Sequence, residues 1–143
     1  MAIKIKLEGF DELLQQIEAA GRAADSAAES AVKAGAQVMQ QELKSALNAA
    51  TESGLANRLP VPEIKKSGNQ VSASVGFQST PYNPNNPSDY HKAIFLNYGT
   101  PTRKLHGQEK ARGFITKAKR RARPKIKKVQ KEALEKILAR LQK

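Results

Sequence analysis

The chain has 143 residues, with 25 lysines and arginines against 13 aspartates and glutamates, and it contains no cysteine or tryptophan. This length is typical of one folded domain, which we expect to span residues 1–143. The missing cysteines exclude disulfides and thiolate chemistry, and no apolar run approaches the roughly 20 residues that cross a bilayer. We therefore expect a protein made in the cytoplasm without a signal peptide or a contact with a membrane.

Two short elements are predicted at the N-terminus. Apolar and charged residues alternate from Ile3 to Leu7, which predicts a half-buried strand over residues 3–7. After Gly9, apolar residues recur on one helical face and predict a short amphipathic helix that ends or bends near Gly21. Its apolar positions are Phe10, Leu13, Leu14 and Ile17.

The next segment, residues 22–50, is rich in alanine and predicts one long helix. Small and apolar residues recur there at steps of three and four, as on one helical face. They are Ala28, Val32, Gly35, Met39, Leu43, Ala46 and Ala50. A face of small residues lets another backbone approach closely. We expect it to pack against the sheet of its own subunit, and a neighbouring copy is the alternative.

Three further strands are predicted in the middle of the chain. Residues 63–66 and 70–77 flank Ser67-Gly68-Asn69, a turn sequence that indicates a hairpin. Alternation places Val71, Ala73, Val75 and Phe77 on the buried face of the second strand. The apolar run 93–98 is rich in β-formers and is closed by Gly99, so we predict a buried central strand over residues 91–98.

Two long loops border that predicted strand. Residues 78–90 contain three prolines and three asparagines, and residues 100–112 are polar and basic without periodicity. Loops of this length in a compact domain are usually functional or mobile. We expect either two solvated, mobile loops or two arms that contact an adjacent subunit.

The C-terminal segment, residues 114–142, has helical spacing and carries most of the positive charge. Residues 1–99 have a net charge of −1, whereas residues 100–143 have a net charge of +13. Pro124 lies inside the helical pattern and predicts a kink or a break near Arg123. The densest cluster of cations is Lys117, Lys119, Arg120, Arg121, Arg123, Lys125, Lys127 and Lys128.

Three interpretations of this cluster remain open. It can be a solvated helix face, a surface that contacts DNA phosphates, or a surface that docks onto an acidic protein. No aromatic residue is interleaved among the cations after Phe114, and no helix-turn-helix or zinc pattern occurs. If DNA is bound, we expect contact with its backbone alone.

An ordered set of motifs resembles a phage family. Phe95-Leu96-Asn97-Tyr98-Gly99-Thr100, followed by a loop and Gly113-Phe114-Ile115-x-x-Ala118, is similar to a pattern of the neck and tail-completion proteins of long-tailed bacteriophages. Asn97 stands where an acidic residue is common in that family, and Gly113 where a proline is common. The opening strand and first helix, from Ile5 to Ile17, resemble the same family.

The resemblance implies a fold, a function and a set of partners. The elements predicted above give an α+β fold, in which a small, mostly antiparallel sheet of residues 3–7, 63–66, 70–77 and 91–98 packs on helix 22–50 and on part of the basic C-terminal helix. The resemblance likewise implies a small α+β subunit. The function is that of a structural virion protein at the head–tail junction or tail top, arranged as a ring of identical copies such as a hexamer. Its partners are further copies of itself, other neck and tail proteins and, at the basic helix, either an acidic partner ring or the DNA backbone in the channel. Its motif residues are Phe95, Leu96, Tyr98, Gly99, Thr100, Phe114, Ile115 and Ala118.

The sequence offers no candidate catalytic or cofactor site. The two histidines, His91 and His106, do not have metal-ligand spacing, and Asp89 near His91 is more often incidental than a ligand. The glycines form no phosphate-binding loop. We therefore expect no enzyme activity, no cofactor, no metal and no small-molecule substrate. A different class of function, nonspecific nucleic-acid binding by the basic C-terminal helix, is the alternative hypothesis.

Overall fold

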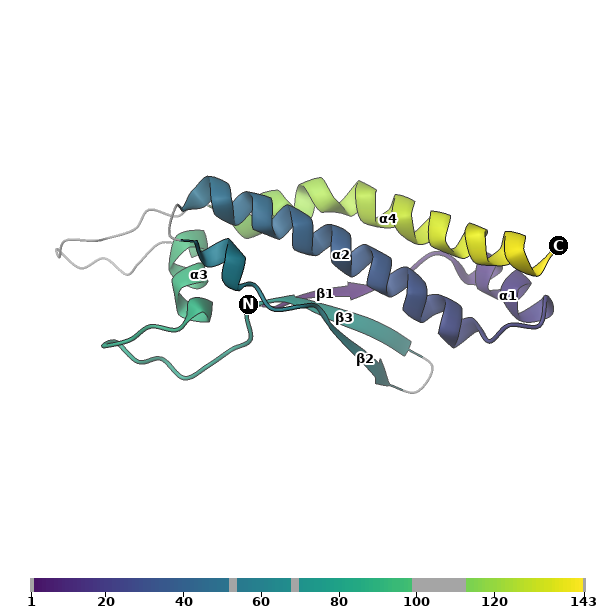
Figure 1. The fold of residues 1–143 in the computed structure, drawn as a ribbon, viewed down its shortest axis with the longest axis horizontal. Coiled ribbons are helices and arrows are strands. Elements are labelled where there is room, and N and C mark those ends of the chain that lie inside the picture. Colours follow the sequence, from purple (N-terminus) through teal and green to yellow (C-terminus); the bar gives the residue numbers. More distant parts are fainter. Residues whose placement is uncertain (1, 52–53, 68–69, 99–112, 143) are drawn as a thin grey trace.

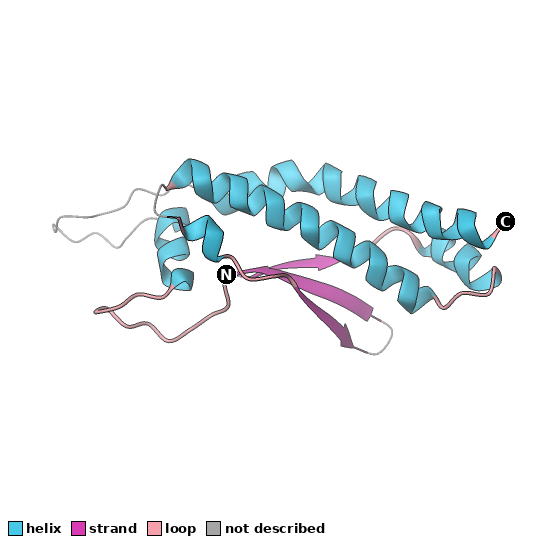
Figure 2. Ribbon diagram, viewed as in Figure 1, coloured by secondary structure: helices cyan, strands magenta, loops and turns pink. Residues whose placement is uncertain are grey.

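A computed structural model describes residues 2–51, 54–67, 70–98 and 113–142. Helices and strands are segregated rather than alternating, as the α+β prediction requires. In chain order the elements are β1 (Ala2–Lys6), α1 (Asp11–Ala19), α2 (Ala24–Ala50), the 3-10 helix η1 (Leu55–Arg58), β2 (Glu63–Ser67), β3 (Gln70–Gly76), α3 (Asp89–Tyr98) and α4 (Phe114–Leu141). The long helices lie over one face of a small sheet (Figures 1 and 2).

The sheet is antiparallel, with β3 between β1 and β2. Its register pairs Ile3 with Val75 on one side and Lys65 with Ser72 on the other. Side chains alternate between the two faces of a strand, so Ile3 and Val75 are buried on the face that carries α2, whereas Lys4 is exposed. The predicted strands at residues 3–7, 63–66 and 70–77, and the buried face of the hairpin, are confirmed.

The helices α2 and α4 run side by side in opposite directions and form the layer above the sheet (Figure 1). Their antiparallel course is marked by two contacts, an ion pair between Glu42 and Lys125 and the approach of Gly35 to Gln130. At 1.5 Å per residue each helix is about 40 Å long. Together with β1–β3 they form what we call the body of the molecule.

Gly35 explains why α2 has a face of small residues. A Cβ atom at this position would lie 2.9 Å from Gln130 Nε2, 3.1 Å from Ile126 Cγ2 and 3.3 Å from Ile5 Cγ2. Glycine therefore lets α4 and β1 approach the α2 backbone together. Packing of the small-residue face within its own subunit is confirmed.

A second, smaller cluster of apolar residues closes the body at the α1 end. Ile17 of α1 is fully buried there with Ala31 of α2 and Leu134 of α4. The chain turns from α1 into α2 at Gly21, whose φ of 94° is in the region that favours glycine. The first helix and its end near Gly21 are therefore confirmed.

The predicted strand at residues 91–98 is wrong, because this segment is the helix α3. Its buried residues are Ala93, Leu96 and Asn97, at the three- and four-residue spacing of a helix. Ser88 accepts a hydrogen bond from the His91 N–H (3.4 Å), as an N-cap residue does, and Asp89 lies in the first turn. These start signals outweigh the β-propensity of the apolar run, so the sheet has three strands rather than four.

The predicted break at Pro124 is also absent, because α4 is one helix of 28 residues. Pro124 and Arg120, whose carbonyl loses its helical partner, both lie on the exposed side of α4, where water can replace that bond. On either side of the proline, Ala122 and Gln130 are buried and hold α4 in the packed interior.

The first predicted loop is observed as the irregular segment 77–88, since α3 already begins at Asp89. The second predicted loop, residues 100–112, lies outside the described residues, as do Gly99 and Thr100. Across the described part of the chain, no helix has the length and apolar character needed to cross a membrane.

Candidate assembly interface

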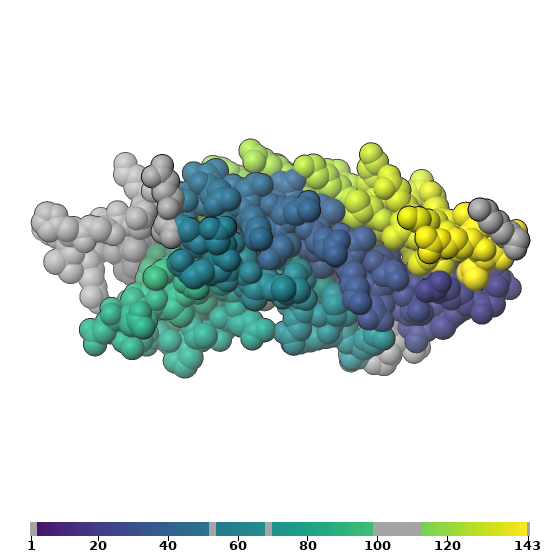
Figure 3. All heavy atoms as spheres, viewed as in Figure 1, coloured from purple at the N-terminus to yellow at the C-terminus, as the bar shows by residue number. Residues whose placement is uncertain are grey.

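The motif residues gather where α3 meets the start of α4. Leu96 from α3 and Phe114, Ile115 and Ala118 from α4 are buried in the main apolar cluster, whereas Phe95 is half-buried. Most of the apolar motif residues therefore build the core rather than a surface. We call this part of the molecule, namely η1, residues 77–88, α3 and the first turn of α4, the α3 end; it lies opposite α1 (Figures 1 and 3).

Asn97 joins the two motif helices. Its side chain is only 5% exposed, and its Oδ1 accepts a hydrogen bond from the Ile115 N–H at 2.9 Å. Its own carbonyl oxygen accepts a second hydrogen bond, from the Gly113 N–H at 3.0 Å. The first N–H groups of a helix have no partner within the helix, so Asn97 satisfies one of these groups in α4. The two bonds also fix the points at which the chain leaves α3 and enters α4.

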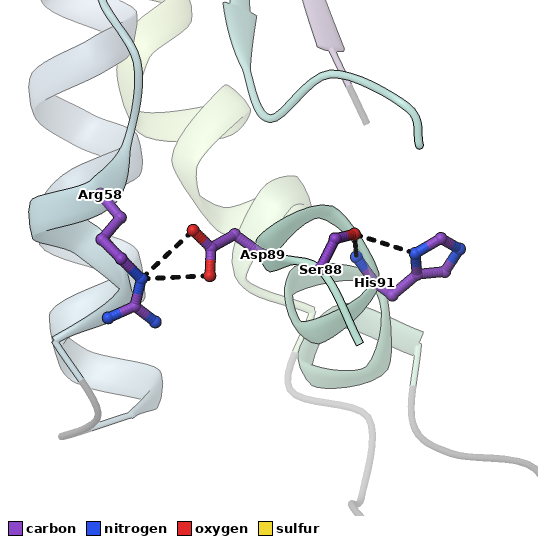
Figure 4. Close-up of polar contacts among 4 residues, drawn as sticks. All are labelled: Arg58, Ser88, Asp89 and His91. Atoms are coloured by element: carbon purple, nitrogen blue, oxygen red, sulfur yellow. Dashed lines mark hydrogen bonds and ion pairs between the residues drawn. The ribbon is translucent and has the colours of Figure 1, made fainter. Parts of the chain in front are cut away.

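An ion pair attaches α3 to η1. The Arg58 Nε atom lies 3.1 Å and 3.2 Å from the two carboxylate oxygens of Asp89 (Figure 4). Asp89 is in the first turn of α3, where the helix dipole also favours a negative charge. Both side chains are partly exposed, so the pair contributes at most about 1 kcal/mol to folding stability.

Ser88 and Tyr82 hold the loop 77–88 against α3. The Ser88 hydroxyl accepts a hydrogen bond from Thr80 Oγ1 at 2.6 Å. The same hydroxyl oxygen lies 3.0 Å from His91 Nδ1 (Figure 4). The Tyr82 ring packs against His91, with centroids 5.0 Å apart, and edge-on against Phe95 at 6.0 Å. Asp89 and His91 therefore have separate partners. Within the described residues, no group of three or more possible ligand side chains could hold a metal ion.

The α3 end also exposes aromatic surface. Tyr98 at the end of α3 is 71% exposed, and Tyr82 in the loop is 55% exposed. Of the large apolar residues that the structure describes, one other is comparably exposed, Val61 between η1 and β2. Isolated exposed apolar residues are ordinary, but two tyrosines at one end of an elongated molecule form a candidate contact surface.

The eight predicted cations of the C-terminal helix are all exposed along α4. Within the described ranges, Lys125 alone among them forms an ion pair, with Glu42 of α2. Lys119, Arg123 and Lys127 line a groove between α4 and β1, together with Lys4 and Lys6. The structure therefore divides a cluster that is continuous in sequence into groove residues and residues that face away from the groove.

Sequence reasoning missed three features of this site, namely the capping role of Asn97, the helix start at Ser88-Asp89 and the cations that β1 contributes to the groove. It treated Asn97 as a departure from the family pattern, although an amide oxygen can cap α4 as a carboxylate would. The Ser88-Asp89 pair just before the apolar run was the available signal for a helix start. It also missed that β1 contributes cations to the same groove as α4, because nothing in the sequence places residues 4 and 119 side by side.

Comparison with known proteins identifies a family but no individual relative. Comparison with curated proteins and with solved structures gave no match. Residues 11–99 match the HK97-gp10-like family, described as "Bacteriophage HK97-gp10, putative tail-component". The match runs from α1 through α3, covers more than half of the chain and agrees with the resemblance carried by the motifs. The chain therefore belongs to the HK97-gp10-like family of phage tail components.

Proposed function

We propose that this chain is a structural virion protein at the head–tail junction or tail top of a long-tailed phage or prophage. It completes the tail or joins it to the head as a ring of identical copies, with a hexamer as the expected size. It is made in the host cytoplasm and acts in the virion by binding rather than by catalysis. Its partners are further copies and other neck and tail proteins.

The main support for this proposal is the exposed aromatic surface of the α3 end, which lies beside hydrogen bonds that fix α3 to α4. Asn97 forms these bonds with Gly113 and Ile115. Beside it the exposed rings of Tyr82 and Tyr98 offer a rigid, amphipathic contact area that costs little conformational entropy to bury. Surfaces of this kind suit assembly by complementary shape, and the family match supports a tail location.

Deletion of the gene from its phage or prophage, followed by electron microscopy of the particles, tests the proposal. We expect DNA-filled heads beside unattached or aberrant tails, and restoration of intact virions when the wild-type gene is supplied in trans. Intact virions from the deletion strain would overturn the proposed role.

A second function, binding of DNA through its phosphates, is favoured by the exposed cations on α4. Seven of the eight cations of the predicted cluster have no acidic partner within the described residues. A duplex-DNA titration across a salt series, with Arg120, Arg121, Lys127 and Lys128 all changed to glutamate, tests this function. Micromolar or tighter binding that falls steeply with salt and is lost in the variant would support it. Absence of binding by the wild-type protein would remove it.

A further inference from the structure

An open groove of about 850 Å³ runs between β1 and α4. Four consecutive residues of β1, from Ile3 to Lys6, line it together with residues of α4 and with Met39 of α2. Side chains of successive strand residues point to opposite faces of a sheet. All four residues can therefore border one groove only where the groove follows the edge of the strand.

The edge in question is free of a strand partner in the described structure. Strand order places β3 on one side of β1 and no strand on the other. At the C-terminal end of β1, the Lys6 carbonyl accepts a hydrogen bond from Gln130 Nε2 of α4 (3.2 Å). This carbonyl therefore points away from β3 and toward α4. Exposed strand edges present backbone donors and acceptors that an extended peptide can pair with.

The side chains of the groove define the character of its occupant. Five cations line it, namely Lys4, Lys6, Lys119, Arg123 and Lys127, against one carboxylate, Glu8. Its apolar lining comes from Ile3, Ile5, Met39 and Ile126. A complementary ligand therefore needs carboxylates for the cations and apolar side chains for the remaining wall.

These features favour a polypeptide over a nucleic acid or a second copy of this chain. A DNA duplex presents phosphates to a basic surface but has no exposed chain that pairs with a strand edge or fills an apolar wall. A second copy is a poor fit, because one face of a strand carries every second residue, and no two acidic residues of this sequence are two positions apart.

We propose that this groove binds an extended acidic segment of a partner protein, which adds to β1 as a fourth strand. Carboxylates of the segment meet the cations that β1 and α4 contribute to the groove, and apolar residues on the face toward the helices contact Ile5 and Ile126. That the partner is a neck or tail protein rests on the proposed function. The groove chemistry does not depend on it.

The probe for the test is a synthetic peptide of about eight alternating glutamates and valines, a typical strand length. Binding to the full-length protein is measured by calorimetry and by amide chemical shifts. We expect the largest shifts at the amides of residues 3–6. A peptide with lysine in place of glutamate is the control ligand, and it should not bind.

Two charge-reversed variants separate the groove from the general positive charge of α4. Lys119→Glu combined with Arg123→Glu changes two groove residues, whereas Arg120→Glu combined with Arg121→Glu makes the same change in charge at adjacent exposed positions outside the groove. At physiological salt we expect the groove variant to weaken peptide binding about tenfold or more, and the matched control to weaken it less than about threefold. Thermal unfolding of both variants checks that they remain folded. If the groove variant does not fold, Lys4→Gln combined with Lys6→Gln is measured against Arg120→Gln combined with Arg121→Gln, which makes the same change in charge.

Three outcomes would overturn the proposal. They are no binding of the acidic peptide, equal weakening by the two variants, and tighter binding of a DNA duplex that only the groove variant abolishes. The last result would assign the groove to nucleic acid. Failure of the proposed neck role can be distinguished from failure of this proposal. Intact virions from the deletion strain would overturn the neck role, whereas peptide binding is measured on the purified protein and does not depend on that result.

Discussion

The body and the α3 end share one apolar cluster, but the α3 end also exposes aromatic surface. In the body, α2 packs on α4 and β3 through fully buried side chains such as Val32, Leu43 and Leu134. At the α3 end, Leu96 and Phe114 are buried in the same apolar cluster. Polar contacts add to this packing, from Asn97 to α4 and from Arg58 to Asp89, and so do the packed rings at Tyr82. Burial of apolar area stabilises a fold in proportion to that area, whereas each hydrogen bond contributes only about 1 kcal/mol. A phage subunit built this way fixes its exposed aromatic end from the same core that holds the body.

The largest effect in this comparison is expected from a cavity in the body. Leu43 of α2 is fully buried in the main cluster. Leu43→Ala should lower the free energy of unfolding by about 3 kcal/mol, because it removes buried methyl groups and leaves a void. Urea unfolding measures this loss, with Tyr98→Ala at the α3 end as an exposed control that should change stability by less than about 0.5 kcal/mol. Equal losses would contradict the placement of Leu43 in the core and of Tyr98 on the surface.

The next effect is expected from the bond that ties α3 to α4. Asn97→Ala leaves the buried Ile115 N–H without its acceptor and should cost about 2 kcal/mol. Asn97→Asp keeps an acceptor and places a negative charge at the start of α4, so it should lose less than half as much. Urea unfolding compares the two variants. Losses of the same size would show that the side-chain oxygen does not cap α4.

A smaller effect is expected at Gly35, where two terms oppose each other. Alanine is the better helix former by about 1 kcal/mol, but its Cβ would lie 2.9 Å from Gln130 Nε2, an atom held by its bond to Lys6. Crowding of this kind typically costs about 1–3 kcal/mol, so Gly35→Ala should destabilise by about 1 kcal/mol net.

A double variant tests the cause of that loss. In a Gln130→Ala background, Gly35→Ala should no longer be destabilising, because the crowded side chain is gone. Thermal unfolding of the four proteins measures the coupling. If Gly35→Ala destabilises the protein equally in both backgrounds, crowding against Gln130 is not the cause of the loss.

The smallest effect is expected from Glu29, a partly exposed carboxylate of α2 whose Oε2 atom lies 2.6 Å from Nζ of Lys66 in β2. The Lys66 hydrogen bond, opposed by desolvation and assisted by the charges of Lys66 and Lys33, lowers the pKa of Glu29. Because the pKa of Glu29 is lower in the folded state, the charged Glu29 stabilises the fold at pH values above the ordinary carboxyl pKa. This stabilisation is lost as the pH falls through the lowered pKa. Titration of Glu29 by NMR should show its pKa rise in Lys66→Ala, and rise less in Lys33→Ala, since Lys33 lies 3.6 Å away. A larger rise in Lys33→Ala would contradict the assignment.

The elements of the body could be predicted from sequence, because burial of one face makes apolar residues recur with the period of a strand or a helix. The alternation from Ile3 to Leu7 and the small-residue steps from Ala28 to Ala50 repeat over enough residues to distinguish a strand from a helix. Residues 93–98 are too few to do so, and β-propensity pointed the wrong way. Pro124 misled for a different reason: whether a proline breaks a helix depends on whether the freed carbonyl is solvated, which only the packed structure reveals. The motif named Phe114, Ile115 and Ala118, which are buried in the main apolar cluster. The groove shared by Lys4 and Lys119 depends on tertiary packing alone.

The most direct test of the central claim is complementation of the deletion strain with surface variants of the α3 end. Tyr82→Ala combined with Tyr98→Ala changes two exposed rings, and Gln15→Ala makes an exposed change in α1 at the opposite end. Electron microscopy of the particles should show intact virions with wild type and with the α1 variant, and DNA-filled heads beside unattached or aberrant tails with the tyrosine variant. Full restoration by the folded tyrosine variant would contradict the claim that the α3 end makes the contacts that complete the tail.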